Sequence, residues 1–208
     1  MHARRFIAFL ILMSLSTLCL GQKRHSDDWF FRAWQTEDGL PDNSISGIAQ
    51  SPDGYLWLGT NGGAIRFNGN QFSNLPLRDR LELPSRQVHA MFLDREGNLW
   101  LGMERGPVIR VQETSFQAFT HADGIPNTRP TSIADDPKGR LWIGFASGAC
   151  RIDGDEVTVL GPAQQVPIGA YASLACDRSG QMWLAKGGKL GRLTEEGFHL
   201  VRSFGTGT

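Results

Sequence analysis

The residue types that most often carry catalysis or metal binding are sparse and scattered in this sequence. Four histidines remain after the N-terminal segment: His25, His89, His121 and His199. No two of them have the four-residue spacing that places a pair of metal ligands on one helix face. Acidic residues gather at 135–136 and 153–156, where turn formation explains them and the spacing of a calcium loop is missing. The sequence therefore predicts no metal site.

Motifs that activate a nucleophile or cradle a phosphate are also missing. No Gly-x-Ser-x-Gly turn is present. The Gly-Gly-Lys run at 187–189 lacks the rest of a phosphate-binding loop. Because nothing pairs a nucleophile with a base at a recognisable spacing, we expect a protein that is not an enzyme, with no catalytic residues and no cofactor.

The charge balance argues against two classes of partner. Lysine plus arginine and aspartate plus glutamate both number 21, so the formal charge is zero. A nucleic-acid module would carry a basic surplus that neutralises phosphates. A module held at a membrane surface would carry a basic patch. We expect neither nucleic acid nor a membrane surface as a partner of these residues.

The sequence contains an internal repeat, which four tryptophans mark most clearly. Four tryptophans lie in one local context, Gly-x-Leu/Met-Trp-Leu/Ile followed by a small residue. They are spaced by 43, 42 and 41 residues: Trp57, Trp100, Trp142 and Trp183. A proline lies sixteen residues before each of them, and an aspartate lies six residues before the last three, where the first repeat has Ser51. Several landmarks in constant register indicate repeats of about forty-two residues.

The first repeat shows which strands each unit contains. The expected strands are 45–50, 55–58, 64–67 and 72–75. Turn-forming residues separate them, and the second strand is apolar on both faces, so both faces must be covered. The predicted fold is therefore an all-β propeller with four blade-like repeats of four antiparallel strands. The repeated tryptophans are predicted to pack the blades, and the alternative is that they stack on sugars.

Ligand contacts are expected where the repeats disagree, because packing explains the positions that every repeat shares. Two turns differ from the Asn-Gly-Gly turn at 61–63, and larger residues replace small polar ones after the proline landmarks. The ligand-binding candidates are Arg86, Arg105, Arg129, Tyr171 and Lys186. Loops on one rim of a propeller converge on its central channel, where these groups can line a polar cleft. The alternative is that each is an ordinary solvated loop residue.

The N-terminus has the pattern of a secretory signal peptide. Two arginines precede an apolar run at 6–20, and Gly21 supplies a small residue for cleavage. The run is short for a membrane span of about 20 residues. We predict a signal peptide at 1–21, propeller repeats at 22–208 and a periplasmic or other extracytoplasmic location. An uncleaved anchor and a lipoprotein attached through Cys19 are the alternatives.

Export would place the two remaining cysteines in an oxidising compartment, where a disulfide can form. Cys150 and Cys176 fall at non-equivalent positions of neighbouring repeats, and Cys150 aligns with the apolar residues Ile65 and Val108. A small apolar strand residue is the favoured interpretation of Cys150. A disulfide between the two cysteines remains open.

The residues of the first repeat resemble a known family, the two-component regulator propeller repeat. The resemblance lies in segments 34–45, with Glu-Asp-Gly-Leu-Pro, and 53–63, with Asp-Gly-Tyr-Leu-Trp-Leu-Gly. Weaker copies occur at 94–102, 123–144 and 177–183. The resemblance implies the extracytoplasmic sensor of a large membrane signalling protein, typically a histidine kinase and sometimes a diguanylate cyclase. Many members of this family are similar to proteins that sense oligosaccharides.

The expected function is therefore non-catalytic sensing of a small molecule or oligosaccharide for a two-component signalling protein. One alternative is a propeller that acts as a protein-interaction scaffold. Another is an enzyme similar to the streptogramin lyases, whose fold also repeats tryptophan-bearing blades. That activity needs histidine and acidic residues on one face, whereas the histidines here do not share a repeat position.

The count of strands favours an open arc of a larger propeller. A fifth outer-strand segment at 29–34 precedes the first repeat, while the last repeat has its own outer strand near 198–201. The next proline landmark would fall near 208–211. We therefore expect additional C-terminal blades and an output domain to complete the protein. Without such blades, the exposed end faces should favour self-association.

Overall fold

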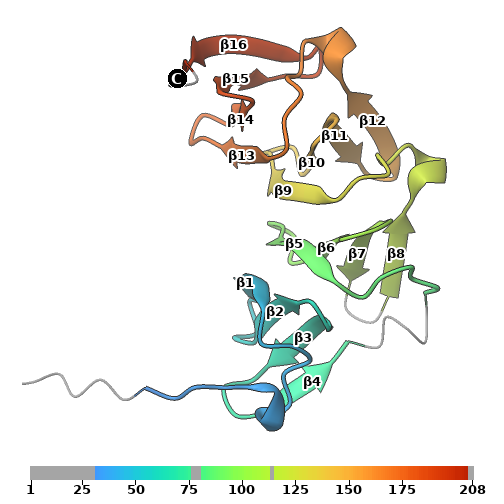
Figure 1. Cartoon of the computed structure of the whole chain (residues 1–208), viewed down its shortest axis with the longest axis vertical. Coiled ribbons are helices and arrows are strands. Elements are labelled where there is room, and N and C mark those ends of the chain that lie inside the picture. Colours follow the sequence, from blue (N-terminus) through green and yellow to red (C-terminus); the bar gives the residue numbers. More distant parts are fainter. Residues whose placement is uncertain (1–30, 76–80, 113–114, 206–208) are drawn as a thin grey trace, which may run out of the picture. The chain divides into compact units, whose positions relative to one another are not determined.

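A computed structural model describes residues 31–75, 81–112 and 115–205 (Figure 1). The chain divides into two units, Met1–Ala33 and Trp34–Thr208. The predicted signal peptide at 1–21 lies outside the described residues. The part of the first unit that is described, 31–33, has no regular secondary structure, and all strands in the described residues belong to the second unit.

Sixteen strands in the described residues form four separate sheets of four. The first sheet contains β1 (Ile45–Gln50), β2 (Leu56–Thr60), β3 (Gly63–Phe67) and β4 (Phe72–Asn74). The second contains β5 (Val88–Leu93), β6 (Leu99–Met103), β7 (Val108–Gln112) and β8 (Ser115–Phe119). The third contains β9 (Pro130–Asp135), β10 (Leu141–Phe145), β11 (Gly148–Asp153) and β12 (Glu156–Leu160). The fourth contains β13 (Ala172–Cys176), β14 (Met182–Lys186), β15 (Lys189–Leu193) and β16 (Phe198–Ser203).

Each sheet is an antiparallel meander whose strands lie in chain order, as a propeller blade requires. Sheets contact one another through their first strands, which we call inner strands: β1 packs against β5, β5 against β9, and β9 against β13 (Figure 1). Within the described residues, the first and fourth sheets do not pack together, so the series is unclosed. The prediction of an all-β propeller with four blade-like repeats, forming an open arc, is confirmed.

The repeated aspartate links the first turn of a sheet to its tryptophan. Indole N–H groups donate to this carboxylate in the last three sheets: Trp100 to Asp94 at 2.7 Å, Trp142 to Asp136 at 2.9 Å and Trp183 to Asp177 at 2.7 Å. In the third sheet, the other carboxylate oxygen accepts the backbone N–H groups of Lys138 and Arg140. This closes the turn in which Gly139 has a φ of +78°. One side chain therefore fixes both the turn and the orientation of the buried ring.

An arginine on the third strand faces each repeated tryptophan across the sheet. The cross-strand partners are Trp57 with Arg66, Trp100 with Arg110, Trp142 with Arg151 and Trp183 with Arg192. Each guanidinium carbon lies between 5.5 and 5.9 Å from the indole ring centre. Such a cation over an aromatic face is stabilising, so the pair is a further packing element of the repeat.

A glycine two residues after the tryptophan lets the next sheet approach. A Cβ atom at Gly59 would lie 2.9 Å from the Val88 side chain, and one at Gly144 would lie 2.6 Å from the Ala172 Cβ. Val88 and Ala172 are the first residues of the inner strands that follow. The fourth sheet has Ala185 at this position, and it is exposed, because no described sheet packs on it. The small residue is thus required by the junction between blades.

The described part of the expected outer-strand segment at 29–34 does not form a strand, and residues 29–30 lie outside the described residues. Residues 31–35 contain no strand. Trp34 instead contacts Phe67 and Phe72 of the first sheet edge-on, with ring centroids 4.9 and 5.6 Å apart. Aromatic pairs favour this arrangement. The sheet already has β4 as its fourth strand, so Trp34 covers its outer strands rather than extending them.

The disulfide that the sequence left open is not formed in the structure. Cys150 and Cys176 are both free, and Cys150 is fully buried in β11. Burial raises the pKa of the Cys150 thiol well above its ordinary value.

In the part of the chain that the structure describes, no helix has the length and apolarity that a membrane crossing requires.

Candidate ligand-binding site

The two edges of each sheet carry different loops. We call the edge where the inner strand begins the start edge, and the edge that holds the first hairpin turn the turn edge. Clefts lie on the turn edge at each junction between neighbouring sheets, with volumes of about 320, 240 and 430 Å³ from the first junction to the third. Each is lined by the repeated tryptophan of the sheet before it: Trp57, Trp100 and Trp142. The clefts are therefore a product of the repeat, and their chemistry depends on the residues that vary.

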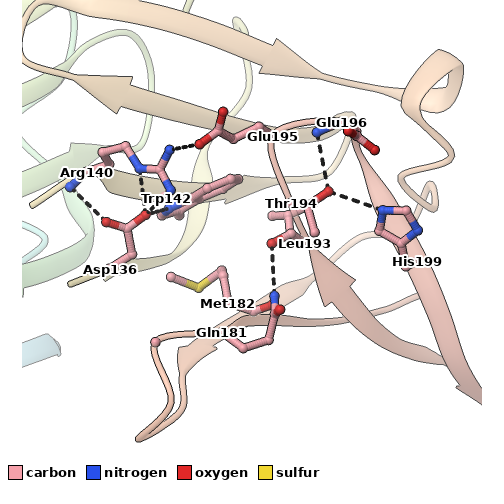
Figure 2. Close-up of a pocket in the computed structure, with 11 residues that line it drawn as sticks. Asp136, Arg140, Trp142, Gln181, Met182, Leu193, Thr194, Glu195, Glu196 and His199 are labelled. Atoms are coloured by element: carbon pink, nitrogen blue, oxygen red, sulfur yellow. Dashed lines mark hydrogen bonds and ion pairs between the residues drawn. The ribbon is translucent and has the colours of Figure 1, made fainter. Parts of the chain in front are cut away.

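The largest cleft lies between the third and fourth sheets (Figure 2). Asp136, Arg140 and Trp142 approach it from the turn between β9 and β10 and from β10 itself. The hairpin between β15 and β16 contributes Thr194, Glu195 and Glu196, and β16 contributes His199. The four-residue connection between β15 and β16 brings three polar residues to the rim.

A network of ion pairs occupies one side of this cleft. Arg140 donates from Nε and Nη2 to Asp136 Oδ2, both at 2.7 Å, and from Nη1 to Glu195 (Figure 2). Lys138 Nζ and Arg151 Nη1 lie 3.6 and 3.8 Å from the Glu195 carboxylate. Arg140 and Asp136 are largely buried, so the guanidinium is held in a fixed orientation by charged partners.

The network shifts the pKa values of its members. Burial raises the pKa of Asp136, but hydrogen bonds from Arg140 and Trp142 outweigh it, and the net pKa is below the ordinary value. The hydrogen bond and charge of Arg140 likewise lower the pKa of Glu195. Burial lowers the pKa of Arg140, yet its bonds to the two carboxylates raise it overall. All three groups are therefore charged at neutral pH.

The opposite side of the cleft carries the groups that a ligand can reach. The Glu196 carboxylate has no hydrogen-bond partner in the described residues, and His199 uses Nε2 for Thr194 Oγ1 at 3.2 Å (Figure 2). Trp142 is only 1% exposed, so its ring packs the junction and presents no stacking face. This cleft can hydrogen-bond a polar ligand. The Thr194 hydroxyl and the His199 imidazole are in contact within this cleft, and no group of three metal-ligating side chains occurs in the described residues.

The structure brings three predicted ligand residues together on the start edge, between the second and third sheets. Arg129 Nη1 lies 3.6 Å from Glu104 Oε1. Arg105 follows Glu104 directly, and the backbone N–H of Glu104 donates to the carbonyl of Gln87, the residue after Arg86, at 2.8 Å. All three arginines are exposed.

The other two predicted residues lie together at the next junction, and one of them differs from expectation. Tyr171 directly precedes Ala172, which pairs with Lys186 across β13 and β14. Tyr171 is 66% exposed, but Lys186 is buried rather than part of a loop. The turn is made by Gly187 and the residue after it, so Lys186 stays at the end of β14. Its Nζ donates to the carbonyls of Phe145 and Gly169, and burial lowers its pKa.

The comparison of repeats missed the residues of the turn edge. Arg140 lies between the turn glycine and the apolar residue that precedes the tryptophan, where the other repeats have Tyr55, Asn98 and Gln181. These four side chains disagree in charge and size, so the rule that identified the start-edge candidates could also have identified this position. Glu195 and Glu196 have no such signal, because the hairpin that carries them is longer than those of the second and third sheets and matches only that of the first in length.

Comparison with known families identifies the repeats. The sequence matches the two component regulator propeller family over residues 39–62, 82–105 and 124–146. Each match covers the loop before a sheet and its first two strands, in the first, second and third sheets. Comparison with curated proteins gave no significant match.

Solved structures share the fold. The extracellular domain of a hybrid two component system, BT3049 of Bacteroides thetaiotaomicron, has a TM-score of 0.65 at 19% identity, over 75% of this chain and 22% of that one. The extracellular domain of the one component system BT4673 from the same organism has a TM-score of 0.65 at 23% identity, over 81% and 25%. Virginiamycin B lyase from Staphylococcus aureus has a TM-score of 0.60 at 19% identity, over 79% and 57%.

The lengths of these proteins differ from that of the matched region. The chain spans about a quarter of the two sensor domains and just over half of the lyase. At these identities the likeness to solved structures shows the fold alone. In three of the four sheets, the preceding loop and the first two strands match the two component regulator propeller repeat.

Proposed function

We propose that the chain is the ligand-sensing propeller portion of an extracytoplasmic sensor in a two-component signalling protein of the histidine kinase type. The observation that carries the proposal is the match of three sheets to two component regulator propeller repeats. The fold likeness to extracellular domains of such systems supports it. In this proposal the propeller is not catalytic, and a separate output domain transmits the signal.

The ligand in this proposal is a small polar molecule, with oligosaccharides as the leading class. Two features support this choice. The large cleft on the turn edge offers carboxylate, imidazole and hydroxyl groups. The start edge offers exposed arginines and Tyr171, which can hydrogen-bond hydroxyl groups and stack on sugar rings.

A lyase is the second candidate, because the virginiamycin B lyase fold is similar to this one. The described histidines argue against it. His89 lies in β5 near the start edge, His121 begins a short 3₁₀ helix at 121–123, and His199 lies by the turn-edge cleft. No two of the described histidines line a common cleft: His89 contacts Glu104 on the start edge, whereas His199 lies with Glu196 on the turn edge.

The test combines export, binding and turnover measurements on the full chain. Expression in a Gram-negative host should release a processed protein, starting near Gln22, into the periplasm. Calorimetry with a panel of oligosaccharides of defined composition should then give saturable binding to at least one member. An intact Met1 in the soluble periplasm would contradict the export step. Linearisation of a streptogramin B antibiotic would favour the lyase, and capture of a protein without any small ligand would favour a scaffold.

A further inference from the structure

The start edge between the second and third sheets carries three exposed arginines that the repeat does not explain. The hydrogen bond from Glu104 N to Gln87 O brings the neighbouring residues Arg86 and Arg105 to the same point of this edge. Pro130, the first residue of β9, would clash with a Cβ atom on Gly102, which places the preceding residue Arg129 at the same junction. We call Arg86, Arg105 and Arg129 the arginine cluster.

Glu104 organises the cluster without neutralising it. Its Oε1 lies 3.6 Å from Arg129 Nη1, and its Oε2 lies 3.4 Å from His89 Nδ1. Oε2 is buried and has no hydrogen bond. Arg86 and Arg105 have no hydrogen bond or ion pair in the described residues. The start edge of this junction thus holds three arginines and one glutamate, in a chain whose formal charge is zero.

Equivalent positions at the other two junctions carry no such charge. At the first junction, the residues that correspond to Glu104, Arg105 and Arg86 are Asn61, Gly62 and Asn43. At the third junction, they are Ala146, Ser147 and Thr128. The third junction has one cation on this edge, Lys186, which is buried against backbone carbonyls, so neither junction carries exposed charge at these equivalent positions. The cost of bringing like charges together at one junction indicates a role other than stability.

We propose that the arginine cluster binds the acidic group of an anionic oligosaccharide, either the carboxylate of a uronic acid or a sulfate ester. Both groups present planar or tripodal oxygens that a guanidinium can bind in a bidentate manner. Glu104 restrains Arg129 before binding, which lowers the entropy lost on association. Arg86 and Arg105 have free donors for the ligand. The choice of a sugar as the carrier of the anion rests on the proposed function above.

The test compares four probes on the full chain by calorimetry in 50 mM salt. The probes are a galacturonic acid oligosaccharide, a sulfated neutral oligosaccharide, an uncharged malto-oligosaccharide and sodium sulfate. The variants are Arg105→Gln alone and the triple Arg86→Gln/Arg105→Gln/Arg129→Gln. The matched control is Arg178→Gln, because Arg178 is also exposed and lies on the turn edge of the fourth sheet. Thermal melting of each variant reports whether folding is preserved.

At least one acidic oligosaccharide should bind the parent chain, and the triple variant should lose at least tenfold in affinity. Arg105→Gln should give a smaller loss, Arg178→Gln should give none, and 0.5 M salt should weaken binding to the parent. Equal affinity of the parent and the folded triple variant for the acidic probe would overturn the site. Binding of the malto-oligosaccharide alone, unaffected by the substitutions, would retain sugar sensing and reject the inference. Cluster-dependent binding of sulfate without any sugar would retain the anion site and reject the oligosaccharide. No binding of any probe would reject both.

Discussion

Three of the repeated tryptophans, Trp57, Trp100 and Trp142, line the junctions between neighbouring sheets. Trp100 is 3% exposed and packs in a cluster with Phe119, whose ring stacks on it at 5.7 Å. Its indole N–H also satisfies Asp94. Because the Trp100 ring is both packed and hydrogen-bonded, shortening this side chain should destabilise the fold.

Replacement of Trp100 by alanine should lower the free energy of unfolding by about 3–5 kcal/mol, the range for a large core aromatic. The change removes the packed ring and leaves Asp94 without its indole donor. Chemical denaturation at equilibrium measures the effect. Trp183→Ala is the matched control, because Trp183 makes the same bond to an aspartate but is only half-buried, so its loss should be smaller. A loss below about 1 kcal/mol for Trp100→Ala, together with abolished ligand binding, would instead make the ring a binding platform.

Asp136 should make the stability of the third sheet depend on acid. Its pKa in the folded chain is below the ordinary value of 3.8, because Arg140 and Trp142 hydrogen-bond the carboxylate. The ionised form is thus bound more strongly in the folded state, and this stability is complete above the ordinary pKa and is lost as pH falls through the folded value. Urea unfolding between pH 7 and pH 3 should show the loss below about pH 4.

The variant Asp136→Asn isolates this effect. Its amide places a donor against Arg140 and Trp142, so at pH 7 we expect a loss of about 3 kcal/mol, as for a broken buried ion pair. Below pH 4 the difference from the parent chain should shrink. An unchanged difference between pH 7 and pH 3 would show that Asp136 does not carry the acid dependence.

At the scale of the element, the glycine after each tryptophan sets how closely two sheets pack. Gly144 is buried in β10, and a methyl group there would lie 2.6 Å from the Ala172 Cβ. Gly144→Ala should therefore lower the free energy of unfolding by about 1–3 kcal/mol, the range for overpacking. Ala185→Gly, at the equivalent exposed position, should change it by less than 1 kcal/mol. Equal effects in thermal or chemical unfolding would show that the glycine is not required by the junction.

Strands could be predicted well because the repeat supplied four copies of the same signals. Residues 45–50 were expected as a strand, and β1 has those bounds, since a proline landmark and a turn glycine limit it on either side. The fold class followed from the same periodicity. The burial of Lys186 could not be predicted, because it depends on which two of three residues form the turn. Two consecutive glycines form the turn, so the lysine remains the last residue of β14.

The candidate site could be predicted only in part, because clefts form between repeats and not within one. The disagreement of repeats pointed to Arg86, Arg105 and Arg129, which the structure places at one junction. Glu104, which holds Arg129, was named only as part of a variable turn. The turn-edge cleft needs the third and fourth sheets in contact, and no pattern along the chain encodes that pairing of Arg140 with Glu195.

At the scale of the whole molecule, the unclosed series leaves apolar residues at its ends. Ile48 in β1 is 66% exposed, whereas Ile133, at the equivalent position of β9, is 9% exposed because β5 packs against that strand. In the fourth sheet, Leu200 and Val201 of β16 are more than half exposed. Exposed apolar faces of this kind promote association.

Sedimentation of residues 22–208 should therefore show association that increases with concentration, together with binding of an apolar dye. Ile48→Ser should reduce both. Ile168→Ser is the control, because Ile168 is also exposed but lies in the loop before β13, away from the inner face of the first sheet. A compact monomer that binds no dye would mean that the four sheets need no further partner.

The first sheet lacks the hydrogen bond from tryptophan to aspartate that is present in the other three sheets. Ser51 replaces the aspartate, so Trp57 has no carboxylate for its indole, and the ring is only half-buried. Among the described sheets, only the second packs against the first, mainly through β5. Local opening should therefore begin there, and amide protons in β1 to β3 should exchange with solvent faster than those in β6 and β10, which lie in sheets with neighbours on both sides. The propeller would then fray from its N-terminal blade while its middle blades remain protected.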